Sequence, residues 1–181
     1  MPADDLKAKF GRRYEMYLQL LREQKKLERT GKFTLAEEEI GEMKKWLVAL
    51  NSLDTYIQKY KGGEESTLRE RQLTIFEDLR DFIEAGQTEG YVKLPTGIGK
   101  TVLFTELIEA LDLKTLIVVP TGILVEQTEE KLQQFAPNID YGKIYAYAKD
   151  HNRQVTITTY NSLVSKVRDE TLNPDEYDCL I

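Results

Sequence analysis

Residues 94–101 read Leu-Pro-Thr-Gly-Ile-Gly-Lys-Thr, and this segment constrains the fold more than any other part of the chain. It follows an apolar run at 91–95 and precedes an amphipathic stretch at 100–111, so we expect it to join a strand to a helix. Closely spaced glycines let the backbone wrap a phosphate group, and the start of a helix adds the positive end of its dipole. The segment therefore predicts a phosphate-binding loop.

Apolar runs and amphipathic stretches alternate on both sides of this loop. Strands are predicted at 91–95, 114–120, 140–147, 154–159 and 177–181. Helices are predicted at 68–85, 100–111, 122–135 and 161–168. Such alternation is typical of βαβ units, so we expect residues 64–181 to form an α/β domain with a parallel sheet and flanking helices.

The N-terminal part of the chain has a different pattern. Apolar residues recur at helical spacing over 5–29 and again over 34–61, and Thr34 with Glu37 forms a capping-box pattern. Glycines and charged residues at 62–66 then read as a linker. Because two helices joined by a short loop lie antiparallel, we predict a helical hairpin over residues 1–63.

Charge is distributed unevenly over these two parts. The chain has a formal net charge of -6; residues 1–63 contain 13 Lys and Arg against 10 Asp and Glu, and the remainder 12 against 21. This argues against a broad basic surface for nucleic acid. It leaves room for local contacts made by hydroxyl groups, backbone amides and helix N-termini.

Several classes of protein are excluded by composition. With one cysteine and one histidine, the chain has no internal disulfide and no Cys/His zinc cluster. No apolar run approaches the ~20 residues of a membrane-spanning helix, and the acidic, polar start of the chain is unlike a secretory signal. We therefore expect a soluble, cytoplasmic protein, and the sequence does not predict its oligomeric state.

The loop resembles motif I of superfamily 2 helicases. The strict G-x-x-x-x-G-K-[ST] pattern misses it because Leu94 occupies the first glycine position, but these helicases use the form Pro-Thr-Gly-x-Gly-Lys-Thr. The resemblance implies a RecA-like motor domain with ATP and Mg²⁺ as cofactors. Lys100 would contact the β- and γ-phosphates and Thr101 would bind Mg²⁺, which makes these two the catalytic candidates. The implied nucleotide-binding residues of the loop are Thr96, Gly97, Ile98, Gly99, Lys100 and Thr101.

Upstream, residues 68–72 read Leu-Arg-Glu-Arg-Gln and resemble the Leu-Arg-x-x-Gln element that precedes motif I in many of these enzymes. The resemblance adds Arg69 and Gln72 to the nucleotide site. An amide can donate and accept at once, so Gln72 suits the adenine edge. The alternative is that this segment is an exposed helix turn.

Two downstream segments, 120–127 and 155–163, resemble motif Ia and the Thr-Tyr-x-Ser-Leu segment of the same superfamily, which contact the sugar-phosphate backbone. Each follows a predicted strand, so both belong at the carboxyl edge of the sheet. The implied nucleic-acid residues are Pro120, Thr121, Gly122, Gln127, Thr159 and Tyr160. The alternative that Thr121 and Thr159 only cap helices stays open, and one residue can do both.

Residues 177–181 resemble the strand that leads into the acidic motif of these enzymes. Because that carboxylate pair is absent from the sequence, we expect a piece of a longer ATP-dependent helicase that binds ATP and Mg²⁺ without hydrolysing ATP. The two downstream motifs are more similar to DNA translocases than to RNA helicases, so DNA is favoured over RNA. Two alternatives remain: a P-loop NTPase or phosphotransferase acting on a small molecule, and a module that docks a protein partner through residues 1–63.

Overall fold

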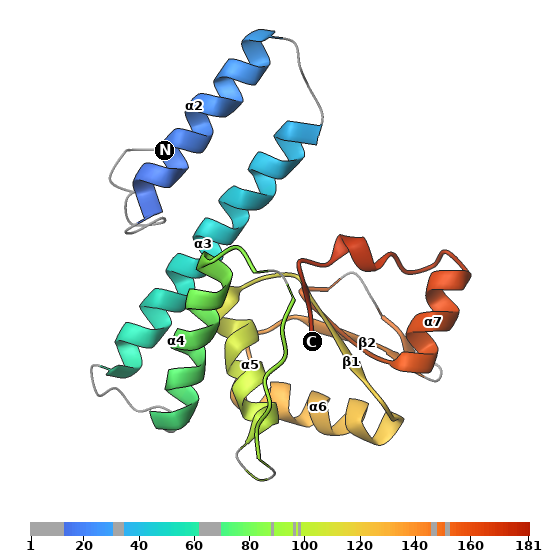
Figure 1. The fold of residues 1–181 in the computed structure, drawn as a ribbon. Helices are drawn as coiled ribbons and strands as arrows, with labels where there is room; N and C mark the ends of the chain where they lie inside the picture. The colour runs from blue at the N-terminus through green and yellow to red at the C-terminus, as the bar shows by residue number, and fades with distance from the viewer. Residues whose placement is uncertain are drawn as a thin grey trace. The chain divides into compact units, whose positions relative to one another are not determined.

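The chain divides into two compact units, Met1–Gly90 and Tyr91–Ile181. The computed structural model describes residues 13–30, 35–61, 70–87, 89–95, 97, 99–145, 148–150 and 153–181. The described part of the first unit is helical, and the second unit combines helices with a sheet (Figure 1).

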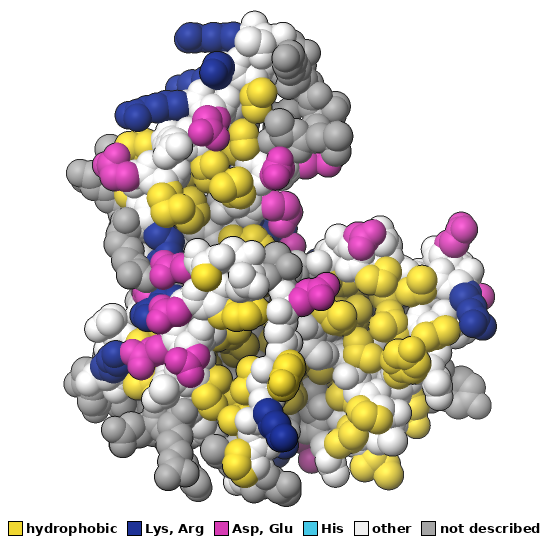
Figure 2. Space-filling model, viewed as in Figure 1, with side chains coloured by type: hydrophobic (Ala, Val, Ile, Leu, Met, Phe, Trp, Pro, Cys, Tyr) yellow, Lys and Arg dark blue, Asp and Glu magenta, His cyan; other side chains and the backbone are white. Residues whose placement is uncertain are grey.

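Helices α2 (Tyr14–Thr30) and α3 (Leu35–Lys61) form an antiparallel pair in the first unit. Arg13, just before α2, bonds to Asp54, whereas Gln24, further along α2, bonds to Lys44, so the two helices run in opposite directions. Apolar side chains gather where the helices meet (Figure 2). The buried members of this cluster are Leu20, Ile40 and Leu47. The predicted helical hairpin is confirmed, while Thr34 of the capping box and the linker at 62–66 lie outside the described residues.

Helix α4 (Glu70–Glu84) packs along α3 in the same unit. The ring of Phe76 is fully buried and stacks on Tyr56, with centroids 5.4 Å apart and an interplanar angle of 11°. One turn further along α4, Arg80 forms an ion pair with Asp54. Helix α4 therefore shares a core with the helical hairpin. The predicted domain boundary after residue 63 stays a prediction.

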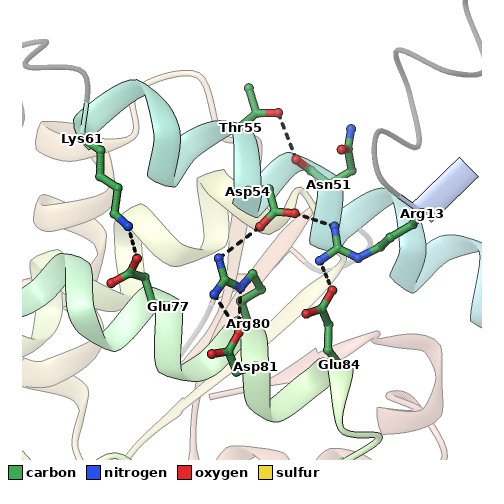
Figure 3. Close-up of polar contacts among 9 residues, drawn as sticks. All are labelled: Arg13, Asn51, Asp54, Thr55, Lys61, Glu77, Arg80, Asp81 and Glu84. Carbon is green, nitrogen blue, oxygen red and sulfur yellow. Dashed lines mark hydrogen bonds and ion pairs between the residues drawn. The ribbon is translucent and has the colours of Figure 1, made fainter.

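A charged network joins α2, α3 and α4 (Figure 3). Arg13 is only 3% exposed, and its guanidinium group donates to Asp54 at 2.6 Å and to Glu84. Asp54 also accepts from Arg80, which is held by Asp81 at 2.7 Å. The Nε atom of Arg13 is buried and has no hydrogen-bond partner in the part of the chain that the structure describes. Buried charge of this kind is tolerated because it is paired.

The second unit is built on a five-stranded sheet with the order β3-β2-β4-β1-β5. Strands β2, β4, β1 and β5 are parallel, and β3 is antiparallel to β2. The strands are β1 (Thr115–Val119), β2 (Tyr141–Tyr145), β3 (Ala148–Lys149), β4 (Val155–Thr159) and β5 (Cys179–Leu180). Each predicted strand downstream of the loop contains one of the parallel strands, which confirms the expected α/β fold.

Helices cover both faces of this sheet (Figure 1). They are α5 (Lys100–Leu111), α6 (Gly122–Phe135) and α7 (Tyr160–Arg168), and a 3-10 turn, η2 (Pro174–Glu176), precedes β5. Neighbouring residues of β1 alternate, so that Ile117 packs with α5 and α6 while Leu116 packs with Leu163 of α7 and with Leu172. Among the described helices of both units, none is long and apolar enough to cross a membrane.

Strand β4 lies between β2 and β1 and is buried along its whole length, although three of its five residues are threonines. Their hydroxyl groups find partners inside the unit. Thr158 donates to the backbone oxygen of Ile144 at 3.0 Å, and Thr156 accepts from the hydroxyl of Tyr177 at 2.9 Å. Burial of these polar groups therefore costs little, and the strand serves as the centre of the sheet.

The predicted strand at 91–95 is wrong. These residues form neither a strand nor a helix, and the side chains of Tyr91 and Val92 are 90% and 55% exposed. A strand forms only where a neighbour supplies hydrogen bonds to its backbone. The sheet ends at β5, which has two residues, and its Leu180 is itself 66% exposed. A two-residue edge strand offers few backbone partners, and residues 91–95 do not join it.

Candidate nucleotide and nucleic-acid sites

The loop before α5 contains two glycines in the left-handed region of backbone space. Gly97 has φ 83° and Gly99 has φ 85°, values that side chains with a Cβ atom disfavour. Gly99 is the N-cap of α5, and its carbonyl oxygen accepts from the amide of Leu103 at 3.0 Å. The backbone thus turns sharply into the helix, as predicted, although no strand precedes the turn.

Among the described residues, no side chain caps the first turn of α5. The N-cap residue is a glycine, so it has no side-chain oxygen to offset the positive end of the helix dipole. The side chain of Lys100 is exposed beside it. The hydroxyl of Thr105 donates to the carbonyl oxygen of Thr101 at 2.7 Å, and Thr101 itself is half-buried. A phosphate group is the natural ligand of such a helix start.

The remaining predicted nucleotide residues are placed only in part. Thr96 and Ile98 lie outside the described residues, as does Arg69. Gln72 lies on α4 of the first unit and is only 3% exposed. To recognise adenine, the amide of Gln72 would have to become accessible, because a buried amide cannot form hydrogen bonds with a ligand.

The two predicted nucleic-acid segments meet at one edge of the sheet. Strands β1 and β4 are parallel neighbours, and their last residues, Val119 and Thr159, are paired in register. Helices α6 and α7 therefore start side by side, at the carboxyl ends of adjacent strands. Open α/β sheets bind their ligands at this edge.

Both threonines at this edge cap a helix. Thr121 accepts from the amide of Leu124 at 3.4 Å. Thr159 accepts from the amide of Ser162 at 3.2 Å and donates to the hydroxyl of Ser162 at 2.9 Å. The side chain of Thr159 is 6% exposed, whereas Thr121 is exposed. The capping interpretation is confirmed for both, and Thr121 is the more accessible of the two to a nucleic-acid backbone.

The other predicted residues of this edge differ in exposure. Pro120, Gln127 and Tyr160 are exposed, and Tyr160 reaches 64%. Gly122 is half-buried because the ring of Tyr145 lies against it: a Cβ atom at Gly122 would stand 1.9 Å from that ring. Tyr145 is the last residue of β2 and alternates with Tyr141 along the predicted strand. That spacing allows either base stacking or the covering of a sheet face, and the contact with Gly122 agrees with the covering role.

Tyr145 brings a third strand to the same edge. Strand β2 is parallel to β4, so its last residue lies on the side where α6 and α7 begin. Tyr145 is 36% exposed, and Ile123 in the first turn of α6 is 69% exposed. The edge therefore combines helix starts and a hydroxyl group, which suit phosphates, with exposed rings, which suit bases.

Strand β5 runs parallel to β1 and is preceded by Tyr177 and Asp178. Asp178 accepts from the backbone amide of Lys114 at 3.0 Å, and the ammonium group of Lys114 lies 4.9 Å from the ring centroid of Tyr177. Burial raises the pKa of the Cys179 thiol above its ordinary value, and the nearby charge of Asp178 raises it further. Cys179 is therefore a protonated strand residue at neutral pH. Among the described residues, no group of three or more His, Cys, Asp or Glu is arranged to hold a metal ion.

Comparison with known proteins agrees with this geometry. Residues 65–181 match the family model described as "Type III restriction enzyme, res subunit". Among curated proteins, the DNA 3'-5' translocase XPB2 of Sulfurisphaera tokodaii is 28% identical over 123 residues. That match covers 63% of this chain and 28% of the relative, so the chain spans less than a third of the relative's length. The resemblance to superfamily 2 helicases is confirmed: the chain belongs to the family of type III restriction enzyme res subunits.

Proposed function

We propose that residues 64–181 are the ATP-binding part of an ATP-dependent DNA helicase or translocase. The observation that carries this proposal is the glycine turn into α5, with Gly97 and Gly99 in left-handed conformations and Lys100 exposed beside them. The family supports an ATP-driven motor, and the relative that translocates on DNA favours DNA over RNA.

The residues of the loop fit a triphosphate with Mg²⁺. Backbone amides at the start of α5 donate to phosphate oxygens, and the ammonium group of Lys100 neutralises their charge. The hydroxyl of Thr101 is the proposed ligand of Mg²⁺, which would offset phosphate charge when bound. Arg69 and Gln72 are proposed to recognise the adenine base. Thr96 and Ile98 complete the proposed loop.

DNA is proposed to lie along the carboxyl edge of the sheet. Thr121 and the amides of the first turn of α6 are proposed to hold phosphates, together with Pro120, Gly122 and Gln127. Thr159 and Tyr160 would contribute from the start of α7. This arrangement explains how an acidic domain can hold a polyanion, because helix starts and hydroxyl groups carry no net charge.

Nucleotide binding is tested by titrating ATP-Mg²⁺ into the wild-type chain and into Lys100→Ala. Loss of a charged hydrogen bond of about 1.5–3 kcal/mol should weaken binding about ten- to a hundred-fold. Lys25→Ala is the matched control, since it removes the same charge from an exposed helix position in the other unit. Equal ATP affinity in Lys100→Ala and in the wild type would refute the phosphate-binding loop.

We further propose that this 181-residue chain binds ATP without hydrolysing it. The resemblance assigns the carboxylates that hold Mg²⁺ and position water to an acidic motif that follows the strand at 177–181, and residues 1–181 do not include this motif. Phosphate release measured with and without DNA should stay at background. Turnover that is stimulated by DNA would show that other carboxylates of the chain perform this role, whereas turnover that needs a small-molecule acceptor would favour a phosphotransferase.

A further inference from the structure

Four basic side chains form one stripe on α2. They follow the spacing i, i+3, i+4 and i+7, which places them on a single side of an α-helix. The members of this basic stripe are Arg22, Lys25, Lys26 and Arg29, and all four are exposed. Figure 2 shows Lys and Arg side chains standing out from α2.

The basic stripe points away from the core of the first unit. The residues of α2 that pack toward α3 include Tyr14, Tyr17, Leu20, Gln24 and Leu27. At about 100° per residue, the centre of that packed face lies nearly opposite the centre of the stripe. The stripe is therefore free of any packing role in the helical hairpin, so its charge can serve another purpose.

The positive charge of the stripe is not compensated within the described part of the chain. None of its four side chains forms an ion pair there, whereas Lys45, Lys61 and Arg80 of the same unit each do. Like charges at these spacings destabilise a helix by a few tenths of a kcal/mol per pair. A polyanion bound along the stripe would remove that cost.

We infer that the basic stripe on α2 is a contact surface for the phosphate backbone of duplex DNA. The inference rests on the proposed function, because DNA is the polyanion that this function brings to the protein. The stripe extends over about 10 Å of helix, from the rise per residue. Duplex DNA carries about six charges over that length, since one falls at every ~1.7 Å of its axis. Residues 64–181 hold 21 acidic against 12 basic residues, so the stripe supplies attraction that the other part of the chain lacks.

The test measures how salt weakens DNA binding. A labelled duplex is titrated with the full chain and with the Arg22→Gln, Lys25→Gln, Lys26→Gln, Arg29→Gln quadruple variant, at several salt concentrations, with fluorescence anisotropy as the readout. Each lost phosphate contact lowers the slope of log K against log salt by about 0.9. We expect the slope to fall by about 2–4 and the affinity near 0.1 M salt to fall at least about ten-fold. Circular dichroism checks that α2 persists, which exposed glutamines should allow.

The matched control removes four positive charges elsewhere. Lys45, Lys114 and Arg153 form ion pairs at the surface, and Lys131 donates to Gln134. Changing these four to glutamine alters the net charge equally. If this control lost as much affinity as the stripe variant, the effect would be one of overall charge and the inference would be wrong.

The remaining outcomes separate the inference from the proposed function. An unchanged salt slope in the stripe variant, with firm binding by the wild type, would overturn the inference and leave the DNA assignment intact. Failure of the wild type to bind DNA even at low salt would overturn both. ATP binding through Lys100 is measured independently and is unaffected by either result.

Discussion

The guanidinium group of Arg13 donates a 2.6 Å hydrogen bond to Oδ2 of Asp54 and thereby ties the start of α2 to the C-terminal half of α3. Asp54 accepts from Arg80 of α4 through its other oxygen, Oδ1, at 3.4 Å. One carboxylate therefore connects all three described helices of the first unit (Figure 3). Asp54 also interrupts the apolar spacing of its helix, and the structure shows why: the position faces two cations.

Removing this carboxylate should destabilise the first unit. Asp54→Ala leaves the buried Arg13 with only Glu84 as a partner, and loss of a charged hydrogen bond costs about 1.5–3 kcal/mol. The measurement is urea denaturation followed by helical circular dichroism. Glu42→Ala is the control, because Glu42 forms an exposed pair with Lys45 that is worth at most about 0.5 kcal/mol. Equal losses of unfolding free energy in the two variants would show that the buried network stabilises the unit no more than an exposed ion pair does.

The two helix caps at the sheet edge should differ in their contribution to stability. Thr159→Ala removes a buried hydroxyl with two partners, so its cost should lie near the upper end of the range of about 0.5–2 kcal/mol for a lost N-cap. Thr121→Ala removes one longer bond from an exposed side chain and should fall near the lower end. Serine at either position should keep most of the stability. Thermal melts of the four variants test this order.

Thr121→Asp separates capping from DNA binding. Aspartate caps a helix as well as threonine does, so the unfolding free energy should hold or rise slightly. Its negative charge would repel a phosphate at the start of α6, so DNA affinity should fall several-fold under the proposed function. A variant that is stable and binds DNA as the wild type does would count against a phosphate at this position.

Two glycines should respond in opposite directions to alanine. At both Gly97 and Gly41, the space that a Cβ atom would occupy has no other atom within 4 Å, so steric contact plays no part. Gly97 has φ 83°, and alanine there should cost about 1–2 kcal/mol. Gly41 lies inside α3, where alanine should stabilise the helix by about 0.5–1 kcal/mol. Chemical denaturation of both variants provides the comparison, and destabilisation by Gly41→Ala would contradict it.

The thiol of Cys179 should react slowly with alkylating reagents at pH 8. Burial disfavours the thiolate and raises its pKa above the ordinary value of 9.0, so the folded chain contains less of the reactive form than the unfolded chain. Because the folded chain binds the thiol proton more tightly than the unfolded chain does, the protonated thiol favours the folded state. This contribution to the free energy of unfolding is fully present below the unfolded pKa and is lost as pH rises through the folded pKa. As the chain has one cysteine, iodoacetamide labelling with and without urea reports on this site alone. Equal rates would contradict the burial.

Local signals predicted the helices of the second unit well. Helices α5 and α6 span Lys100–Leu111 and Gly122–Phe135, the predicted ranges, because Gly99 and Thr121 mark their starts in the sequence itself. Strand β4 lies within the apolar run at 154–159 that predicts a strand. The same reasoning failed at 91–95, where an apolar run pairs with no strand of the sheet.

The amino-acid sequence by itself predicted the glycine turn into α5, the helix caps and the parallel α/β alternation. These features depend on backbone preferences and on contacts between residues close together in the chain. Long-range packing was needed to establish which strands are neighbours, and therefore that Thr121 and Thr159 share an edge with Tyr145. It also sets the burial of Gln72 and joins Arg13 to Asp54 and Glu84. These features depend on contacts between residues far apart in the chain, whose partners no local pattern specifies.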